Sequence, residues 1–437
     1  MIQSWTQYFQ IDFYNKKPQN IIWIILLIGF GIRLAALMTY GFALTINSDD
    51  QAYIRSALNL LETGKITYHL GEIIPTVHIM PGQTLLLSAV FLIFGSGDVG
   101  ICVAKILWIL MGTLCIYFVY LIGKYISNVF IGLLSAFLLA IFIPQVLTDN
   151  LLLTETPFFL SLLGMVYFSI RLANEHRMLH FYLLMMFYFI GIIFKANIAL
   201  FPLVLLVYLI LKKYPIKLAV KQFVIAFILL LFVLGPWWIR NYIHYGEFIP
   251  LTGGAGNPLL HGTYQGSGHL YGDDYQTAVE KVEAQNPANN FERMKLQEEV
   301  ANERIKSWWN EHRETFFESY IIMKTKVQWH EQFYGIEIFN FSKDLINKLH
   351  LVIVYAAIAS LIIVPFLRDK WKEYIFLLGL IVYNTALNDV FYAYNRYNQP
   401  FMFILFILIS TAIVVITQKL FRSRINGGYG VSNRDGT

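Results

Sequence analysis

Long apolar runs, separated by short polar connectors, make up most of this sequence. Their lengths approach the roughly 20 residues that a helix needs to cross the hydrocarbon core of a bilayer. A helix satisfies its own backbone hydrogen bonds in lipid, whereas an open sheet does not, so the pattern predicts a helical bundle. We expect crossing segments at residues 21–44, 98–121, 129–146, 157–172, 180–195, 198–211, 219–238, 346–367, 373–388 and 399–417.

One further apolar run, "PGQTLLLSAVFLIFG" at residues 81–95, is short for a span and opens with Pro-Gly. Lys and Arg concentrate in short cytoplasmic loops, so their distribution decides where this run lies. If it does not cross, fifteen basic residues are cytoplasmic and only four lie in short outer loops; if it crosses, thirteen of the fifteen move outside. We therefore expect it on the outer side, either lying in the interface or re-entering the membrane, while a crossing stays the alternative. The bundle then has about ten to eleven membrane segments, with both termini in the cytoplasm.

This topology leaves most of the polar sequence on the outer side of the membrane. A first outer loop covers residues 45–97, and a short loop lies around 148–156. The long outer loop, 237–345, begins with an irregular Gly-rich stretch and then alternates charged and apolar positions as surface helices do. Residues 425–437 are expected to form a disordered cytoplasmic tail. The whole chain, 1–437, is interpreted as a single integral membrane domain.

The composition agrees with this all-α polytopic interpretation. Of the 437 residues, 57% are hydrophobic and 14% charged, and the mean hydropathy is +0.55, which excludes a soluble globular protein. The two cysteines, Cys102 and Cys115, fall inside one apolar run, so neither a zinc motif nor a disulfide framework is present. Phosphate-cradling glycine motifs are also absent, so nucleotide substrates are unsupported, and we expect no nucleic-acid partner.

Two adjacent carboxylates, Asp49 and Asp50, follow the first span in "TINSDDQAY". Ser48 and Gln51 have the spacing of a capping box, and acids in a first helical turn are favoured by the helix dipole. The pair is therefore explained by a helix start alone. The alternative is catalytic: Asp49 shares a helix face with Tyr53, and a carboxylate at the membrane surface can act as a general base.

Isolated cations lie beside aromatic residues at the outer ends of several spans. Each one alone is explained by a side chain that reaches the interface from a helix end. Four on one leaflet together indicate binding of an anionic group at the outer surface, for which lipid phosphate is the natural candidate. These four are Lys105, Lys195, Arg240 and Arg396.

Other polar residues near the outer surface have two interpretations each. Glu155 opens an apolar helix and serves either as a first-turn acid or as a second acid of a site. His69, Glu72 and His78 share the first loop with the Asp pair and could bind a divalent metal, although their spacing matches no known ligand motif. Arg33 lies inside the first span, where we expect it to find a partner within the bundle.

Several short motifs, in order, carry a resemblance to a known family. After the Asp pair come "AYIRSALNLLETGKI", "MPGQTLLL…FLIFG", "TDNLLLTETPFF", "FKANIALFP", "GPWWIRNYIHYGEFIPL" and "NRYNQP". Together they resemble the bacterial branch of the GT-C glycosyltransferases, which is similar to the aminoarabinose transferases of lipid A and, more distantly, to the protein O-mannosyltransferases. The resemblance runs from the first span to about Pro400.

The resemblance implies a membrane glycosyltransferase acting at the outer face of the bacterial cytoplasmic membrane. The donor would be a hexose or pentose on a polyprenyl phosphate, usually undecaprenyl phosphate, and the acceptor an envelope lipid, glycan or protein. Position in the motifs assigns the catalytic acid to Asp49, with Asp50 beside it, and the acid of the second outer loop to Glu155. The basic positions near the donor phosphate are those of Lys195, Arg240 and Arg396, with Lys105 added by its location.

Aromatic residues complete the predicted site. Trp237, Trp238, Tyr397 and Tyr53 could line the substrate, although tryptophans at this depth also form an ordinary interfacial belt. No cofactor is required by the sequence, and a divalent metal is left open. The rival functions are a transporter or flippase for lipid-linked sugars and a polymerase or ligase that uses lipid-linked sugars. A transporter is expected to show inverted repeats and charged residues at mid-membrane, and Arg33 is the one convincing charge of that kind.

Overall fold

The computed structural model describes residues 18–69, 74–253, 256–267, 274–367 and 370–428, and within them the regular elements are helices. The first half contains α2 (Pro18–Tyr40), α3 (Asp49–Thr63), α4 (Gly82–Phe94), α5 (Asp98–Ile126), α6 (Val129–Ala140), α7 (Ile143–Thr148), α8 (Glu155–Glu175), α9 (Met178–Phe194), α10 (Phe201–Leu211) and α11 (Ile216–Tyr245). Short 3-10 turns, η1 (Gly41–Ala43) and η2 (Ala196–Ile198), join some of them.

The second half begins with a long loop rich in short helices. These are α12 (Gly256–Gly262), α13 (Tyr275–Glu283), α14 (Asn290–Glu311), α15 (Arg313–Phe317), the π-helix η3 (Glu318–Met323) and α16 (Lys324–His330). The chain then returns to long helices with α17 (Lys343–Ser360), η4 (Leu361–Phe366), α18 (Trp371–Val390), the turns η5 (Asn395–Tyr397) and η6 (Gln399–Phe401), and α19 (Met402–Gly428).

The protein is a multi-pass membrane protein. Six of the described helical segments are long and apolar enough to cross a bilayer: 20–43, 98–126, 155–175, 216–245, 343–364 and 395–420. Four shorter apolar helices, 82–94, 129–140, 178–194 and 196–211, accompany them. Every predicted crossing segment therefore contains a helix, but length and composition qualify only six as full spans, and the predicted number of ten to eleven stays a prediction.

One predicted span, 129–146, is not a single helix, which corrects the sequence interpretation. Asn128 caps α6, accepting a hydrogen bond from the backbone N–H of Ile131 at 3.0 Å, and α6 ends at Ala140. A new short helix, α7, begins three residues later, at Ile143, with Pro144 in its first turn. Proline lacks the N–H that would continue α6 but fits the first turn of a new helix.

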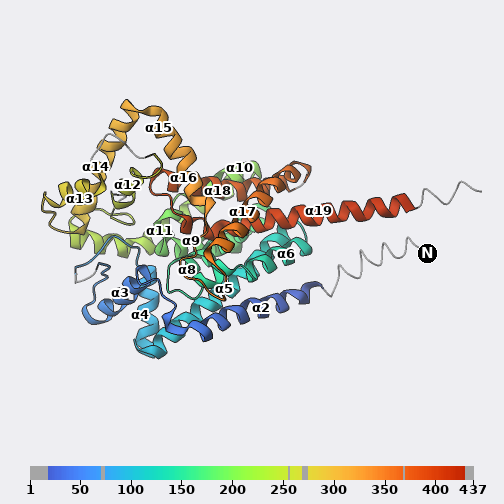
Figure 1. The fold of residues 1–437 in the computed structure, drawn as a ribbon, viewed down its shortest axis with the longest axis horizontal. Coiled ribbons are helices and arrows are strands. Elements are labelled where there is room, and N and C mark those ends of the chain that lie inside the picture. The colour runs from blue at the N-terminus through green and yellow to red at the C-terminus, as the bar shows by residue number, and fades with distance from the viewer. Residues whose placement is uncertain (1–17, 70–73, 254–255, 268–273, 368–369, 429–437) are drawn as a thin grey trace, which may run out of the picture.

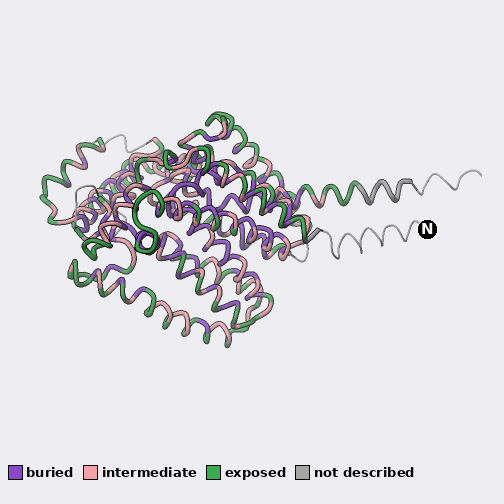
Figure 2. The backbone as a smooth tube through the Cα atoms, turned by 90° about the horizontal axis from the view of Figure 1, so that it is seen from below, coloured by how far each residue is buried: buried purple, intermediate pink, exposed green. Residues whose placement is uncertain are grey.

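The core of the bundle is formed by helices that pack closely through small residues. A Cβ on Gly123 of α5 would lie 2.9 Å from the Cα of Gly132 of α6, so the two backbones are in contact, as small residues allow in membranes. Figure 2 shows the buried positions in the middle of the molecule and exposed ones around it. The exposed residues on α11 are largely apolar, including Phe223 and Phe232, as expected for a surface that faces lipid.

The loop helices gather at one end of the bundle. Figure 1 shows α3, α4 and α12–α15 at this end, and the start of α2 and the far end of α19 at the other. The run at 81–95 forms α4, which packs against α3 and α5. Of the tail predicted at 425–437, residues 425–428 continue α19, and the rest lies outside the described residues.

Candidate active site

Four charged side chains from four separate parts of the chain meet at the end of the bundle where the loop helices lie. Asp49 comes from the first turn of α3, Glu155 from the first turn of α8, Lys195 from the junction of α9 and η2, and Arg396 from η5. We call these four residues the charged cluster. All four were predicted site residues, and the structure brings them into direct contact.

Arg396 holds the cluster together. Its Nε and Nη2 donate to the Oε1 and Oε2 of Glu155 at 2.7 and 2.8 Å, a bidentate pair. Its Nη1 donates to the Oδ2 of Asp49 at 2.7 Å. The planar guanidinium fork can thus orient two carboxylates at once, which the single point charge of a lysine cannot do. The ring of Phe333 lies 5.4 Å from the guanidinium carbon.

The two acids of the charged cluster differ in exposure. The side chain of Glu155 is only 2% exposed and accepts hydrogen bonds from both Arg396 and Lys195, the latter at 2.6 Å. The side chain of Asp49 is 36% exposed. Glu155 is therefore committed to holding the two cations, and Asp49 is the carboxylate that a substrate can reach.

Lys195 retains capacity to bind an anion. Its ammonium carries three donors, and within the described part of the chain it forms a hydrogen bond to Glu155 alone. The ring centroids of Phe158 and Tyr397 lie 5.6 and 5.4 Å from its Nζ, and its side chain is 14% exposed. An incoming phosphate oxygen would find here a cation with two uncommitted N–H groups.

Tyr68 holds the second oxygen of Asp49. Its phenol donates to Oδ1 at 2.8 Å, and its ring lies against the imidazoles of His69 and His78, with centroids 5.5 and 5.0 Å away. Burial raises the pKa of the Tyr68 phenol, so it stays a donor at neutral pH. No sequence pattern indicates Tyr68, because it lies 19 residues from Asp49 in a loop without periodicity.

The segment that carries Tyr68 is fixed by α11. Arg240 donates from Nη1 to the carbonyl oxygen of Thr76 at 2.7 Å and from Nη2 to that of Ile66 at 3.5 Å. Tyr245 donates from its hydroxyl to the carbonyl oxygen of Pro75. Arg240 therefore supports the first loop, whereas its predicted role beside the donor phosphate stays untested.

The two tryptophans next to Arg240 also donate to backbone. The Nε1 of Trp237 donates to the carbonyl oxygen of Leu251 at 2.6 Å, and that of Trp238 to Pro250 at 2.7 Å. These bonds fasten the start of the long loop to the end of α11. Both indole N–H groups are thus occupied by the protein, and any contact with substrate would involve the ring faces.

Asp50 and Lys105 build the turn that presents Asp49. Asp50 is 3% exposed and accepts from the backbone N–H groups of Ile46, Ser48 and Gln51 at 2.9, 3.1 and 2.9 Å. The Nζ of Lys105 donates to the carbonyl oxygens of Gly41 and Leu44, both at 2.9 Å. The structure thus gives both side chains backbone partners and does not bring them into the charged cluster.

The capping box predicted at the start of α3 is wrong. Ser48 is the N-cap residue but forms no side-chain cap, and the Nε2 of Gln51 donates to the hydroxyl oxygen of Thr45 at 3.2 Å. The carboxylate of Asp50 binds the N–H groups of the turn instead. A carboxylate accepts up to four hydrogen bonds, so it can organise a whole turn where a serine hydroxyl satisfies one or two groups.

The residues proposed as weak metal ligands lie next to Tyr68. The rings of His69 and His78 are 5.1 Å apart between centroids, while Glu72 lies outside the described residues. In the described ranges, no group of three or more His, Cys, Asp or Glu side chains could hold a metal ion. The divalent metal stays an untested prediction. Burial, reinforced by the nearby His69, lowers the pKa of His78 to about 4, so its imidazole is neutral at pH 7.

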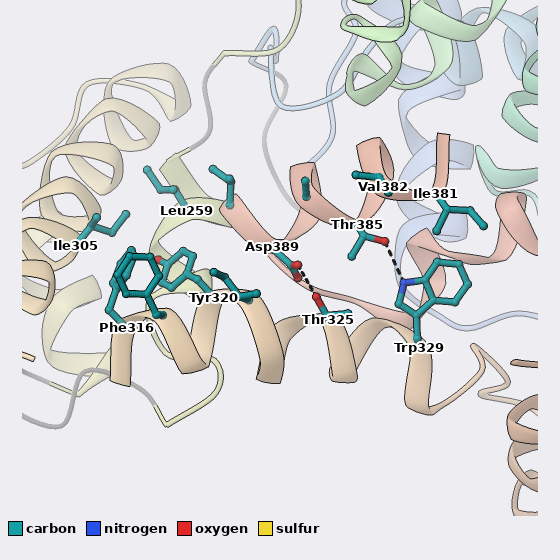
Figure 3. Close-up of a pocket in the computed structure, with 14 residues that line it drawn as sticks. Leu259, Ile305, Phe316, Tyr320, Thr325, Trp329, Ile381, Val382, Thr385 and Asp389 are labelled. Atoms are coloured by element: carbon teal, nitrogen blue, oxygen red, sulfur yellow. Dashed lines mark hydrogen bonds between the residues drawn. The ribbon is translucent and has the colours of Figure 1, made fainter. Parts of the chain in front are cut away.

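An apolar groove lies between the long-loop helices and α18. Its cavity of about 700 Å³ is bounded by η3 and α16 on one side and by α18 on the other (Figure 3). Four of the polar side chains on its wall bind one another in pairs: Thr325 donates to Asp389 at 2.7 Å, and Trp329 donates to Thr385 at 3.0 Å. The groove therefore offers mainly hydrocarbon surface, and α16, which lines it, also contacts η5 and so adjoins Arg396.

Comparisons with known proteins support one class. Residues 79–239 match the family model described as dolichyl-phosphate-mannose-protein mannosyltransferase. No curated protein matches the sequence. The solved archaeal oligosaccharyltransferase AglB from Archaeoglobus fulgidus, in complex with an inhibitory peptide and a dolichol-phosphate, superposes with a TM-score of 0.59 at 15% identity. The match covers 98% of this chain and 53% of AglB, so this chain spans about half the length of that relative.

The chain thus has a fold similar to that of AglB, and its matched segment is similar to a mannosyltransferase family of the GT-C class. Both findings agree with the GT-C resemblance of the sequence motifs. A second solved structure, ArnT from Cupriavidus metallidurans bound to undecaprenyl phosphate, is similar with a TM-score of 0.44 and 10% identity over 90% of this chain and 78% of that one.

Proposed function

We propose that the protein transfers a sugar from a polyprenyl-phosphate carrier to an acceptor hydroxyl or amine on the extracytoplasmic side of a bacterial membrane, with both termini in the cytoplasm. The observation that carries this proposal is the geometry of the charged cluster. A partly exposed carboxylate, Asp49, is held by hydrogen bonds on each oxygen, and Lys195, a cation with spare donors, lies in the same cluster. That combination suits removal of a proton from one reactant and stabilisation of a phosphate leaving group.

The chemistry that fits this geometry is a single displacement with inversion. The acceptor oxygen or nitrogen attacks the anomeric carbon of the donor sugar and forms the new glycosidic bond. The bond between the anomeric carbon and the phosphate oxygen breaks, and the lipid phosphate leaves with its electron pair. The acceptor proton passes to Asp49. Each Asp49 oxygen has two lone-pair sites and uses one for Tyr68 or Arg396, so one remains free on each to take that proton.

The remaining members of the charged cluster either stabilise the charge on the leaving phosphate or hold Asp49 in position. Lys195 stabilises the negative charge that develops on the phosphate as the bond breaks. Arg396 and Glu155 hold each other, and through Arg396 they fix the orientation of Asp49. Arg396 and Glu155 are positioning residues in this scheme.

A lipid-linked donor is supported by the apolar groove. An isoprenoid chain needs a hydrocarbon surface, and the groove offers one beside helix α16, which contacts the η5 turn. The solved AglB structure contains a dolichol-phosphate, a carrier of this chemical class. A transport function gains no comparable support, because Arg33, the charge inside the first span, is paired with Asp149 and both side chains are fully buried.

The proposal is tested by transfer in a defined system. Purified protein in liposomes is mixed with undecaprenyl-phosphate sugars and a panel of lipid, glycan and peptide acceptors, and the product is measured by mass spectrometry. We expect transfer by the wild type and a loss of about 100-fold or more in Asp49→Asn. Asp98→Asn, an exposed acid outside the charged cluster, serves as the matched control and should transfer normally. Transfer by Asp49→Asn at the wild-type rate would overturn the role of Asp49, and translocation of the carrier without transfer would favour the flippase.

A further inference from the structure

A line of aromatic rings connects the long loop with the charged cluster. His261 stacks on Tyr275 with centroids 4.3 Å apart, and Tyr392 lies 5.8 Å from His261. Tyr394 follows at 6.1 Å from Tyr392, and Tyr397 at 5.7 Å from Tyr394. The Tyr397 ring lies 5.4 Å from the ammonium of Lys195. We call these five residues the aromatic strip.

The middle of the aromatic strip is built by an extended segment. Tyr394 has φ −143° and ψ 133°, a strand conformation, in which alternate side chains point to the same side. Tyr392 and Tyr394 therefore share one side, and Ala393, which is 1% exposed, points away from them. The segment joins the end of α18 to the turn that holds Arg396, so the two phenols stand directly before the charged cluster in the chain.

The long loop clamps this segment in place. The side-chain amide of Gln265 binds both backbone groups of Ala393: Nε2 donates to the carbonyl oxygen at 2.7 Å, and the N–H of Ala393 donates to Oε1 at 2.8 Å. Gly262 touches the same segment, since a Cβ added there would lie 1.7 Å from the carbonyl oxygen of Phe391. Only glycine permits so close a backbone approach.

The strip differs from a packed core in two respects. All five of its side chains are partly exposed, so they are not enclosed by neighbours. Four carry a phenol hydroxyl and one an imidazole, so each combines a flat apolar face with a polar tip. The Tyr275 hydroxyl and the Nε2 of His261 bond each other at 2.7 Å. The apolar groove has a different character, because its lining is mainly hydrocarbon.

We propose that the aromatic strip binds the saccharide part of the acceptor, so that the acceptor is a glycan or carries one. This inference rests on the proposed transfer reaction. The apolar C–H face of a sugar ring stacks on an aromatic face, while its hydroxyl groups bond to the phenol hydroxyls of Tyr392 and Tyr394. The strip runs several rings away from Lys195, which is further than a single transferred sugar would occupy, so it suits an acceptor of more than one sugar unit.

An extended peptide is a less suitable occupant of this surface. Extended peptides commonly bind by adding a strand to an exposed backbone edge. The extended segment at Ala393 has no such edge there, because Gln265 already occupies its N–H and its carbonyl oxygen. A hydrocarbon chain is better served by the apolar groove than by rings that carry hydroxyl groups.

The test measures saccharide binding separately from transfer. Purified protein in detergent micelles is titrated with maltotetraose, cellotetraose and chitotetraose, with binding followed by saturation-transfer NMR and calorimetry. We expect at least one tetrasaccharide to bind, and Tyr392→Leu and Tyr394→Leu each to raise its Kd by about 10-fold, since leucine keeps apolar volume but removes the flat face. Tyr392→Phe keeps the ring and should change the Kd by less than about 3-fold. Tyr355→Leu, an exposed tyrosine on α17, is the matched control and should leave the Kd unchanged.

The outcomes separate this inference from the proposed function. Loss of saccharide binding in the leucine variants, with the Phe variant intact, supports the strip even if no transfer is found. In a transfer assay with a glycan acceptor, the leucine variants should raise the acceptor KM by about 10-fold with little change in kcat. Absence of binding by all three tetrasaccharides would overturn the inference, as would equal binding by both leucine variants and wild type. Transfer to peptide or simple lipid acceptors that is insensitive to the leucine variants would overturn it too, while leaving the proposed function standing.

Discussion

Two buried arginine–carboxylate pairs in this protein look alike in isolation. Arg33 in α2 donates from Nε to the Oδ2 of Asp149 at 2.7 Å, and both side chains are fully buried. Arg396 in η5 donates from Nε to the Oε1 of Glu155, also at 2.7 Å, and both are nearly buried. Each pair joins segments more than 100 residues apart in the chain. Distance and burial alone do not distinguish them.

The surroundings of the pairs are different. Asp149 also accepts from Gln145 at 2.9 Å and Thr156 at 2.8 Å, and Arg33 donates from Nη1 to the carbonyl oxygens of Gly29 and Ala140. A Cβ on Gly112 would lie 2.2 Å from the Asp149 carboxylate, so the space around that pair is filled.

The second pair is open on one side. Arg396 donates its third hydrogen bond to the partly exposed Asp49. Glu155 also binds a second cation, Lys195, which has spare donors. A buried ion pair therefore marks a site when one of its members also binds an exposed group with unused hydrogen-bonding capacity. A pair that is fully buried and leads to no exposed group holds helices together.

The largest effect is expected when the Arg33–Asp149 pair is broken. Arg33→Met leaves the Asp149 charge buried without a partner, which costs about 3–5 kcal/mol of folding free energy. We expect a marked fall in the unfolding midpoint, measured by thermal unfolding in detergent and by gel filtration. The double variant Arg33→Met/Asp149→Leu removes both charges and should recover most of the loss. A single variant as stable as wild type would show that the pair does not hold α2 in place.

The next largest effect is expected from a change in the Arg396–Glu155 pair. Arg396→Lys keeps a positive charge but cannot bind Glu155 and Asp49 together. We expect transfer to fall by about 100-fold because Asp49 loses its orientation, with a smaller fall in unfolding midpoint than in Arg33→Met. Arg171→Lys is the matched control, since Arg171 also binds one glutamate, Glu175, in bidentate fashion but lies outside the charged cluster. Equal transfer by both lysine variants would contradict a positioning role for Arg396.

The sequence predicted the helices because membrane burial imposes a strong pattern. Each apolar run contains a helix, and the break in 129–146 was readable from Pro144, which cannot continue a helix begun upstream. The number of full spans could not be settled by hydropathy, because several helices are shorter than a bilayer is thick.

The candidate site could be predicted only in part. Asp49, Glu155, Lys195 and Arg396 stood out because charge beside apolar sequence is expensive and therefore informative. The same argument also selected Arg240, which binds loop carbonyls, since a lone cation near a helix end does not reveal whether its partner is a backbone group or a carboxylate. Tyr68 could not be found in this way, because a loop tyrosine carries no cost that marks it.

A smaller effect is expected when the hydrogen bond from Tyr68 to Asp49 is removed. Tyr68→Phe removes the hydrogen bond to the Oδ1 of Asp49 and keeps the ring. A hydrogen bond to a charged group contributes about 1.5–3 kcal/mol, so we expect kcat for transfer to fall by about 10-fold with donor KM nearly unchanged. Tyr182→Phe, an exposed tyrosine on α9, is the control. Unchanged kcat in Tyr68→Phe would mean that Arg396 alone positions Asp49.

The smallest effect is expected in the pH dependence of stability, through His78 in the first loop. Burial lowers the pKa of His78 to about 4 from the value near 6.5 that it has in an unfolded chain. Between these values the unfolded state binds more protons than the folded state, so the free energy of unfolding falls as pH drops from about 6.5 toward 4, and His78 has no such effect above that window. His78→Gln removes this contribution, so its unfolding midpoint should fall less than that of wild type between pH 7 and 5. Because carboxylates titrate equally in both proteins, only the difference between the two curves reports on His78, and parallel curves would show that its imidazole is protonated in the folded protein.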